Sequence, residues 1–413
     1  MSTTASITRE ECKVQLAAIA GTDNISIGGV SITVAPGDAE QIGQILRFAD
    51  SNGIVVTPHG GGTKRNWGNA VQTGIRLDLG RMNKLREHPW QDMTCTVEAG
   101  CTWATMQAEL ARHGQMVALD PLWPDSATVG GIVAANDGGS WRLKYGGLRD
   151  LIIGMIVVLA DGTIAKTGGK VVKNVAGYDL HKLMTGSFGT LGVIAEVNFR
   201  LHPLEPNLQT WTASASNPIE FNQALRALLD SQLTPTSVQL RLNAQECSLD
   251  VRVAAPAECM PEHAAKLQKI FGAMQLQESD ESVWQAQQQL HDTADAIVLR
   301  ISALPSDLCS LGSELRDFAA KKDMSVDIAA QANGLVTVAL KASPDAAKTL
   351  IEHLRNRLRN SGGSVVALQV PTSLRGTFDL WGCESNALPL MKEIKRRFDP
   401  NRILNPGRFV GNI

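Results

Sequence analysis

The sequence lacks an excess of charge of either sign and has few aromatic residues. Of its 413 residues, 39 are Lys or Arg and 41 are Asp or Glu, so the formal net charge is only −2, and aromatic residues make up 5%. Because no basic excess is available to neutralise a phosphate backbone, we do not expect nucleic acid as a partner. The 44% of hydrophobic residues predicts a folded, soluble chain, and its length favours two or three domains of about 100 to 200 residues each.

Long apolar segments and metal-binding spacings are also missing. The longest apolar run, Leu151 to Ala160, is about half as long as a bilayer crossing requires, and Met1 to Glu11 lacks the apolar stretch of a signal peptide. The seven cysteines form no CxxC pair and the eight histidines form no HxH or HxxxH pair. We therefore expect a cytoplasmic protein without a metal site, one that reaches the inner face of the cell membrane only through a partner.

Glycine is present in quantity but is distributed unevenly. Of 37 glycines, 28 fall in residues 1 to 200 and none in residues 201 to 250. Glycine is favoured where the backbone turns with positive φ or approaches a ligand closely. The change of composition, together with two prolines in Leu201 to Pro206, predicts a domain boundary there.

The first part alternates short β-branched runs with glycine-bearing turns. Helices are expected at Asp38 to Asn52 and Thr102 to His113, because Asp38 and Thr102 can cap their first turns while Gly53 and Gly114 can end them. Strands are expected at Ile25 to Val34, Ile54 to Pro58, Ile75 to Leu79, Thr94 to Glu98 and Ile152 to Leu159.

The second part predicts a different arrangement. Asn217 at the N-cap, Pro218 at the first helical position and Glu220 at the third predict a helix that ends near Gln232. Further on, the expected order is a βαββαβ, ferredoxin-like unit. Its elements are strand Ile297 to Ser302, helix Pro305 to Ala320, strand Ser325 to Ala330, strand Leu335 to Lys341, helix Pro344 to Asn360 and strand Val365 to Val370.

Three glycine-rich segments are candidates for a ligand site. In the first, Gly60, Gly61 and Gly62 follow an apolar strand, so their N–H groups can converge on a phosphate; a flexible surface turn is the alternative. The second, Asp120 to Arg149, is rich in small residues, which suit either a flat ligand or close packing. In the third, Lys173 to His202, a glycine-bearing turn leads into an apolar strand, and alone it would be a tight turn before a core strand. Neither GxxxxGK[ST] nor GxGxxG occurs, which argues against P-loop and Rossmann sites.

Taken together, these segments resemble the vanillyl-alcohol-oxidase family, whose PCMH-type FAD-binding domain is an α+β fold with two lobes. The resemblance rests on ordered motifs and a C-terminal tail. They are APGDAEQIGQIL, PHGGGTK, VEAGCTW, DPLWPDSATVGGIVAANDGG, GSFGTLGVIAEVNFRLHP and FDPNRILNPGRF. It implies a PCMH-type domain at 1–205, a ferredoxin-like cap at 206–385 and a segment at 386–413 that returns to the FAD domain.

The same resemblance implies the cofactor contacts. Expected FAD-binding residues are Pro58, Gly60, Gly61, Gly62, Thr63, Pro121, Thr128, Gly130, Gly131, Ala134, Gly189, Ile194 and Asn405. Some relatives link FAD covalently through a histidine at the position that is Thr63 here. We therefore expect non-covalent FAD, with His59 packing or bonding the loop.

Within that family, GGKVVKNVAGYDLHKLMTGSFGTLG and LRGTFDLWG look most like the E subunit of glycolate oxidase. This implies an FAD-dependent oxidoreductase that converts glycolate to glyoxylate together with a D-like flavoprotein subunit and an iron–sulfur subunit. A self-sufficient FAD-dependent 2-hydroxy-acid dehydrogenase and a non-catalytic assembly subunit are the alternatives.

The catalytic residues are not identified by any motif. The HxGDGN motif, which in similar D-2-hydroxy-acid dehydrogenases helps bind metal and the substrate carboxylate, does not occur. Arg241 and Arg375 are the candidates for an anion contact in the cap, with a surface or structural ion pair favoured for each. Lys173, Tyr178 and Asp179 would tune the flavin, or else Tyr178 fills core space while Lys173 and Asp179 pair.

Overall fold

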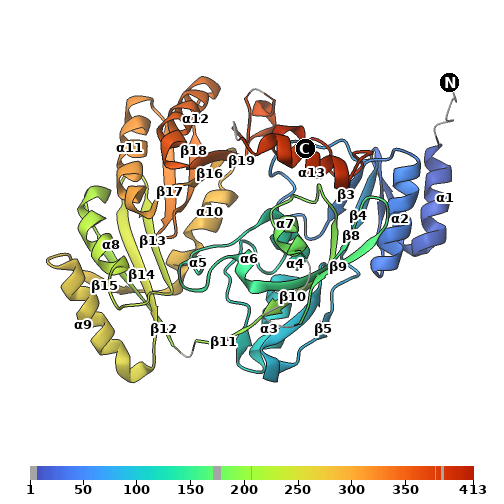
Figure 1. The fold of residues 1–413 in the computed structure, drawn as a ribbon. Coiled ribbons are helices and arrows are strands. Elements are labelled where there is room, and N and C mark those ends of the chain that lie inside the picture. Colours follow the sequence, from blue (N-terminus) through green and yellow to red (C-terminus); the bar gives the residue numbers. More distant parts are fainter. Residues whose placement is uncertain (1–6, 171–177, 206, 377, 383–385) are drawn as a thin grey trace.

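A computed structural model describes residues 7–170, 178–205, 207–376, 378–382 and 386–413. Figure 1 shows an N-terminal part, blue to green, beside a part coloured yellow to orange that is built on a large sheet. The red C-terminal segment, which includes α13 (Leu388–Phe398), returns to the N-terminal part near β3 (Val56–His59). None of the helices in the described ranges is long and apolar enough to cross a membrane.

The first lobe of the N-terminal part is a four-stranded sheet in the order β1-β2-β4-β3. Its helix α2 begins after Asp38, whose carboxylate accepts a hydrogen bond from the Gln41 N–H at 2.8 Å, as the sequence predicted. The elements are α1 (Arg9–Ala20), β1 (Ile25–Gly28), β2 (Ser31–Val34), α2 (Ala39–Ser51), β3 and β4 (Ile75–Asp78).

The second lobe is a five-stranded sheet in the order β5-β6-β10-β8-β9, with short helices around it. Its strands are β5 (Leu85–Glu87), β6 (Thr94–Glu98), β8 (Ile152–Val158), β9 (Ile164–Gly168) and β10 (Val193–Arg200). Its helices are α3 (Trp103–Ala111), α4 (Val129–Ala135), α5 (Arg142–Tyr145), α6 (Leu148–Leu151) and α7 (Leu180–Met184). β7 (Gln115–Met116) pairs with β11 (His202–Pro203) where the chain leaves this lobe.

Two of the expected strands differ in detail. Residues 25 to 34 form the antiparallel pair β1 and β2 instead of one strand, because Gly29 takes a positive φ of 52° and reverses the chain. The strand expected at Ile54 to Pro58 begins two residues later and extends to His59. Residue His59 therefore lies at the end of β3, directly before the glycine run.

The large sheet has eight strands in the order β15-β12-β14-β13-β17-β18-β16-β19. The expected βαββαβ order is confirmed in β16 (Ile297–Ser302), α11 (Leu308–Lys321), β17 (Ser325–Gln331), β18 (Leu335–Lys341), α12 (Pro344–Leu358) and β19 (Ser364–Gln369). In the chain, helix α10 (Ala286–Asp292) directly precedes β16.

The preceding residues repeat the same topology, which the sequence did not reveal. The elements are β12 (Leu208–Ser214), α8 (Asn222–Leu229), β13 (Ser237–Leu242), β14 (Cys247–Ala254), α9 (Met260–Phe271) and β15 (Leu276–Ser279). β13 pairs antiparallel with β17, so two ferredoxin-like units join at one strand of each. The helix predicted from Asn217 starts as a 3₁₀ turn, Pro218–Phe221, and α8 ends at Leu229, not near Gln232.

Candidate cofactor site

The glycine run after β3 presents a row of free backbone donors. β3 and β4 pair in parallel, and their ends place Gly60, Gly61 and Gly62 at the edge of the first sheet. The N–H groups from Gly60 to Lys64 donate no hydrogen bond to any residue in the described ranges. Converging unpaired N–H groups are what binds a phosphate or diphosphate through the backbone.

Glycine is required in this run because a second loop packs directly against it. A Cβ at Gly60 would lie 2.1 Å from Oγ1 of Thr128, and a Cβ at Gly61 would lie 1.7 Å from the Ser126 carbonyl oxygen. Gly62 has a positive φ of 73°, whereas Gly61 does not. The loop is thus held against the segment before α4 and is not a free surface turn.

A cavity of about 410 Å³ opens at this point. Three segments that are far apart in sequence line it together with the C-terminal tail. Of the residues expected to bind FAD, it is lined by Pro58, Gly60, Gly61, Gly62, Thr63, Thr128, Gly130, Gly131, Ala134, Gly189, Ile194 and Asn405. Pro121 is buried and does not line it.

Asn405 brings the C-terminal tail into the cavity. Its Nδ2 donates to the Phe188 carbonyl at 2.8 Å and its backbone N–H donates to the Val56 carbonyl at 3.1 Å. Its Oδ1 is buried without a hydrogen-bond partner, although a buried polar atom normally has one. An orphaned acceptor in the wall of a cavity indicates a ligand that donates to it.

The cavity is electropositive. Lys64, Arg65, Arg76, Arg375 and Arg408 line it, and its described lining contains no carboxylate. Burial lowers the pKa of His59, and the cations of Arg76, Arg65 and Arg408 lower it further against the opposing effect of Asp78. The positive charge of the lining therefore comes mainly from its arginines, which suits an anionic ligand.

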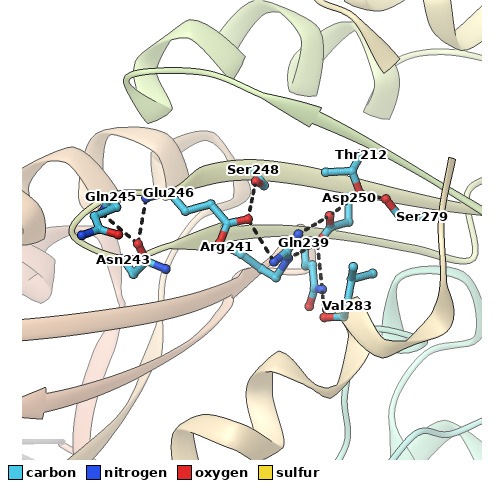
Figure 2. Close-up of polar contacts among 10 residues, drawn as sticks. All are labelled: Thr212, Gln239, Arg241, Asn243, Gln245, Glu246, Ser248, Asp250, Ser279 and Val283. Atoms are coloured by element: carbon cyan, nitrogen blue, oxygen red, sulfur yellow. Dashed lines mark hydrogen bonds and ion pairs between the residues drawn. The ribbon is translucent and has the colours of Figure 1, made fainter. Parts of the chain in front are cut away.

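The two arginines proposed as anion contacts have different positions. Arg375 lines the cofactor cavity and donates to the Asn66 carbonyl at 3.1 Å, so it does not lie at a separate site in the cap. Figure 2 shows Arg241 between Asp250 and Glu246, with Nε 2.6 Å from the buried Asp250 carboxylate. Arg241 is therefore a structural ion-pair residue, which is the interpretation that the sequence favoured.

The residues expected near the flavin ring are only partly described. Tyr178 is 89% exposed, so the prediction that it fills core space is wrong. Asp179 pairs with Lys182 at 2.7 Å. Lys173, the partner expected for Asp179, lies outside the described residues. Neither Tyr178 nor Asp179 lines the cofactor cavity.

The structure also assembles a polar cluster that sequence reasoning missed. Lys64 forms an ion pair with Asp137 at 2.8 Å, and both side chains are more than nine-tenths buried. The Lys64 ammonium lies 5.6 Å from the ring of Trp67 and 5.3 Å from that of Trp123. His291 of α10 stacks on Trp67, with ring centroids 5.2 Å apart.

Arg300 of β16 completes this cluster, with its guanidinium carbon 5.9 Å from the Trp67 ring. α10 is held to the N-terminal part by Trp123, which donates to Gln288 at 3.0 Å and to Asp292 at 2.9 Å. The only sequence signal was the position of Lys64 and Trp67 just after the glycine run. No motif marks His291 or Arg300. Among the described residues, no group of three or more His, Cys, Asp or Glu side chains could hold a metal ion.

Comparison with known proteins agrees with this geometry. Residues 30–168 match the family described as FAD binding domain, and residues 381–409 match the C-terminal domain of FAD linked oxidases. This chain is an FAD-linked oxidoreductase. The structure of substrate-bound p-cresol methylhydroxylase superposes on this chain with a TM-score of 0.70 and 17% sequence identity. The match covers 97% of each chain and confirms the PCMH-type α+β fold.

Two curated relatives match this chain in sequence over nearly its whole length. Glycolate oxidase subunit GlcD of Bacillus subtilis is 25% identical over 91% of this chain and 88% of its own. The mitochondrial D-lactate dehydrogenase [cytochrome] of Arabidopsis thaliana is 24% identical over 92% of this chain and 73% of its own.

Proposed function

We propose that this chain oxidises small 2-hydroxy acids, glycolate among them, with non-covalently bound FAD. The observation that carries the proposal is the row of unpaired N–H groups from Gly60 to Lys64 at an electropositive cavity. Relatives named for glycolate and D-lactate support the substrate class, because both are 2-hydroxy acids.

The residues present fit FAD. The unpaired N–H groups of the glycine run would hold the diphosphate, and each charge-assisted bond contributes about 1.5 to 3 kcal/mol. Gly130, Gly131 and Ala134 offer a wall without large side chains, and Asn405 offers its free Oδ1. Bound FAD supplies a two-electron oxidant for the α-carbon of a hydroxy acid. Arg375 and Arg408 add positive charge beside the anionic cofactor.

We further propose that the chain works as the E-type subunit of a glycolate oxidase complex. Its partners would be a D-like flavoprotein subunit and an iron–sulfur subunit. The chain would be cytoplasmic and would reach the membrane only through these partners. The motifs GGGTK and LRGTFDLWG support this assignment. The division into a domain at 1–205, a cap at 206–385 and a return at 386–413 remains part of the same proposal.

A self-sufficient dehydrogenase is the second candidate, and the cluster of Arg300 and His291 favours it. Unlike an assembly subunit, it would need its own contacts for substrate, and this cluster offers a cation and an imidazole next to the cofactor cavity. The two candidates differ in whether the isolated chain is reduced by substrate.

The test begins with the ultraviolet–visible spectrum of the purified chain, which should show bound flavin. Anaerobic addition of glycolate or D-lactate, with and without the partner subunits, then measures flavin bleaching. Bleaching by the chain alone supports the self-sufficient enzyme, and bleaching only with partners supports the complex. A colourless chain that does not take up added FAD would overturn both and leave an assembly role.

A further inference from the structure

We propose that Arg300 and His291 form the binding site for a 2-hydroxy acid, with Arg300 taking the carboxylate and His291 the hydroxyl group. This inference rests on the proposed function and names the residues that would recognise its substrate. It assigns a substrate contact to the cap sheet of a chain whose sequence lacks the HxGDGN motif.

Arg300 is a cation without a counter-ion of its own. Its side chain forms no ion pair or hydrogen bond with another residue in the described ranges, and its guanidinium carbon lies 5.9 Å from the centre of the Trp67 ring. Burial lowers the pKa of Arg300; Asp137 partly offsets this, and the Arg142 cation adds to it. Asp137, the carboxylate whose charge acts on Arg300, is already paired with Lys64 at 2.8 Å. A partly buried guanidinium left in this state is suited to bind an anion.

His291 provides an acceptor beside this cation. Its side chain is buried, with 5% of its surface exposed, and its Nδ1 has no hydrogen-bond partner. The ring is fixed on two sides, by stacking on Trp67 at 5.2 Å and by an edge contact with Trp123 at 5.6 Å. A neutral imidazole nitrogen held in one orientation can accept a hydrogen bond from a hydroxyl group.

The position of the site relative to the cofactor follows from Lys64. Lys64 lines the cofactor cavity, and its ammonium also lies against the rings of Trp67 and Trp123. From β16 and α10 respectively, Arg300 contacts Trp67, and His291 contacts both Trp67 and Trp123. A small ligand there would lie between the cofactor cavity and the sheet, in reach of groups from both parts of the molecule.

The chemistry balances with FAD as the oxidant. The hydroxyl proton of R–CH(OH)–COO⁻ would pass to Nδ1 of His291, and bound FAD would supply the oxidant for the α-hydrogen and its two electrons. The carbon–oxygen single bond becomes a carbonyl, which gives R–CO–COO⁻. The carboxylate stays bound to Arg300 throughout and orients the α-carbon.

The test uses oxalate, a dicarboxylate that cannot be oxidised in this way, and the FAD-loaded chain. Calorimetric titration should show binding to the wild type and binding at least about ten-fold weaker to Arg300→Gln, because a charge-assisted contact of about 1.5 to 3 kcal/mol is lost. Arg300→Lys should keep part of the affinity. The control is Arg226→Gln on helix α8, whose side chain is 87% exposed, and this variant should bind oxalate like the wild type.

His291→Gln separates binding from proton transfer. Oxalate affinity should change by less than about three-fold, whereas the rate of flavin reduction by glycolate or D-lactate should fall by about 10² or more, the usual contribution of a general base. Circular dichroism and flavin content establish that each variant is folded and loaded.

The outcomes distinguish this inference from the proposed function. Oxalate that does not bind, or that binds equally to the wild type and Arg300→Gln, overturns the site even if 2-hydroxy acids bleach the flavin. A flavin that no 2-hydroxy acid reduces, with oxalate binding still dependent on Arg300, contradicts the proposed reaction while the anion site stands.

Discussion

The Lys395 ammonium contacts the Asp399 carboxylate at 2.5 Å where the C-terminal tail meets the cofactor cavity. Both side chains are almost completely buried. The ammonium also donates to the carbonyls of Thr190 and Leu404, at 2.7 and 2.8 Å, and Asp399 accepts from the Leu404 N–H at 2.8 Å. The pair therefore joins the tail that carries Asn405 to the turn that follows Gly189.

Removing one partner of this pair should be strongly destabilising. Lys395→Met should lower the free energy of unfolding by about 3 to 5 kcal/mol, because it leaves the Asp399 charge buried without its counter-ion. Denaturant unfolding measures the change, and FAD retained through purification should fall because Asn405 loses its support. Arg396→Gln on the same helix removes an exposed pair and should cost less than about 1 kcal/mol. Equal stability of the two variants would show that the buried pair contributes nothing.

Gly60→Ala should release FAD. The new Cβ would lie 2.1 Å from Oγ1 of Thr128, which accepts a hydrogen bond from Gly131 at the start of α4. The two loops must separate, so the N–H groups lose their common direction and FAD affinity should fall at least about ten-fold. Flavin content and circular dichroism measure this.

The matched control for this substitution is Gly28→Ala. No atom lies within 4 Å of its new Cβ, and its φ is not positive, so flavin content should be unchanged. Gly61→Val is a less selective test, because its Cβ would strike the Ser126 backbone. Full flavin occupancy in Gly60→Ala would mean that the glycine run does not hold the cofactor.

The flavin should leave the protein on acid precipitation. Thr63 stands where a histidine would form a covalent link in some relatives, and His59 is the only histidine among the described residues that line the cavity. The measurement is the flavin absorbance of the supernatant and of the washed precipitate. Yellow colour that stays with the wild-type precipitate but not with that of His59→Gln would contradict the prediction and identify the linked residue.

Acid should destabilise the folded chain through His291. Burial lowers the pKa of His291 to about 4 from 6.5, with Lys64 and Arg300 acting in the same direction and Asp137 opposing them. Between pH 4 and pH 6.5, His291 therefore binds a proton in the unfolded chain but not in the folded chain. Stability at this site is therefore lost as the pH falls.

On acidification from pH 7 to pH 5, the wild type should lose about 2 kcal/mol more than His291→Gln, which has no titrating group at this position. Urea unfolding of both proteins at the two pH values gives the difference. Identical losses would show that His291 titrates normally in the folded chain.

Much of the cofactor cavity could be predicted from the sequence, because its parts are local. A strand followed by three glycines, a helix capped by Thr128 and a turn at Gly189 each depend on residues a few positions apart. The order of these motifs along the chain then indicated a PCMH-type FAD-binding domain. Pro121 shows the limit, since it belongs to a matching segment but does not line the cavity.

The duplicated cap was only half predicted. The βαββαβ order from β16 to β19 follows from clear strand and helix patterns, whereas the same order from β12 to β15 has no matching sequence to reveal it. The pairing of β13 with β17 joins the units through backbone hydrogen bonds, which carry no residue signature.

The sequence by itself determined which segments become strands, capped helices and glycine turns, because those choices depend on neighbours within a few residues. Only the tertiary structure decided which distant side chains meet. Asn405 reaches Phe188 across 217 positions and Lys395 reaches Thr190 across 205, while His291 and Arg300 approach Trp67 from another part of the chain. Such contacts arise from the packing of whole sheets against one another, and no local pattern encodes the partner that a buried lysine or an unpaired arginine will face.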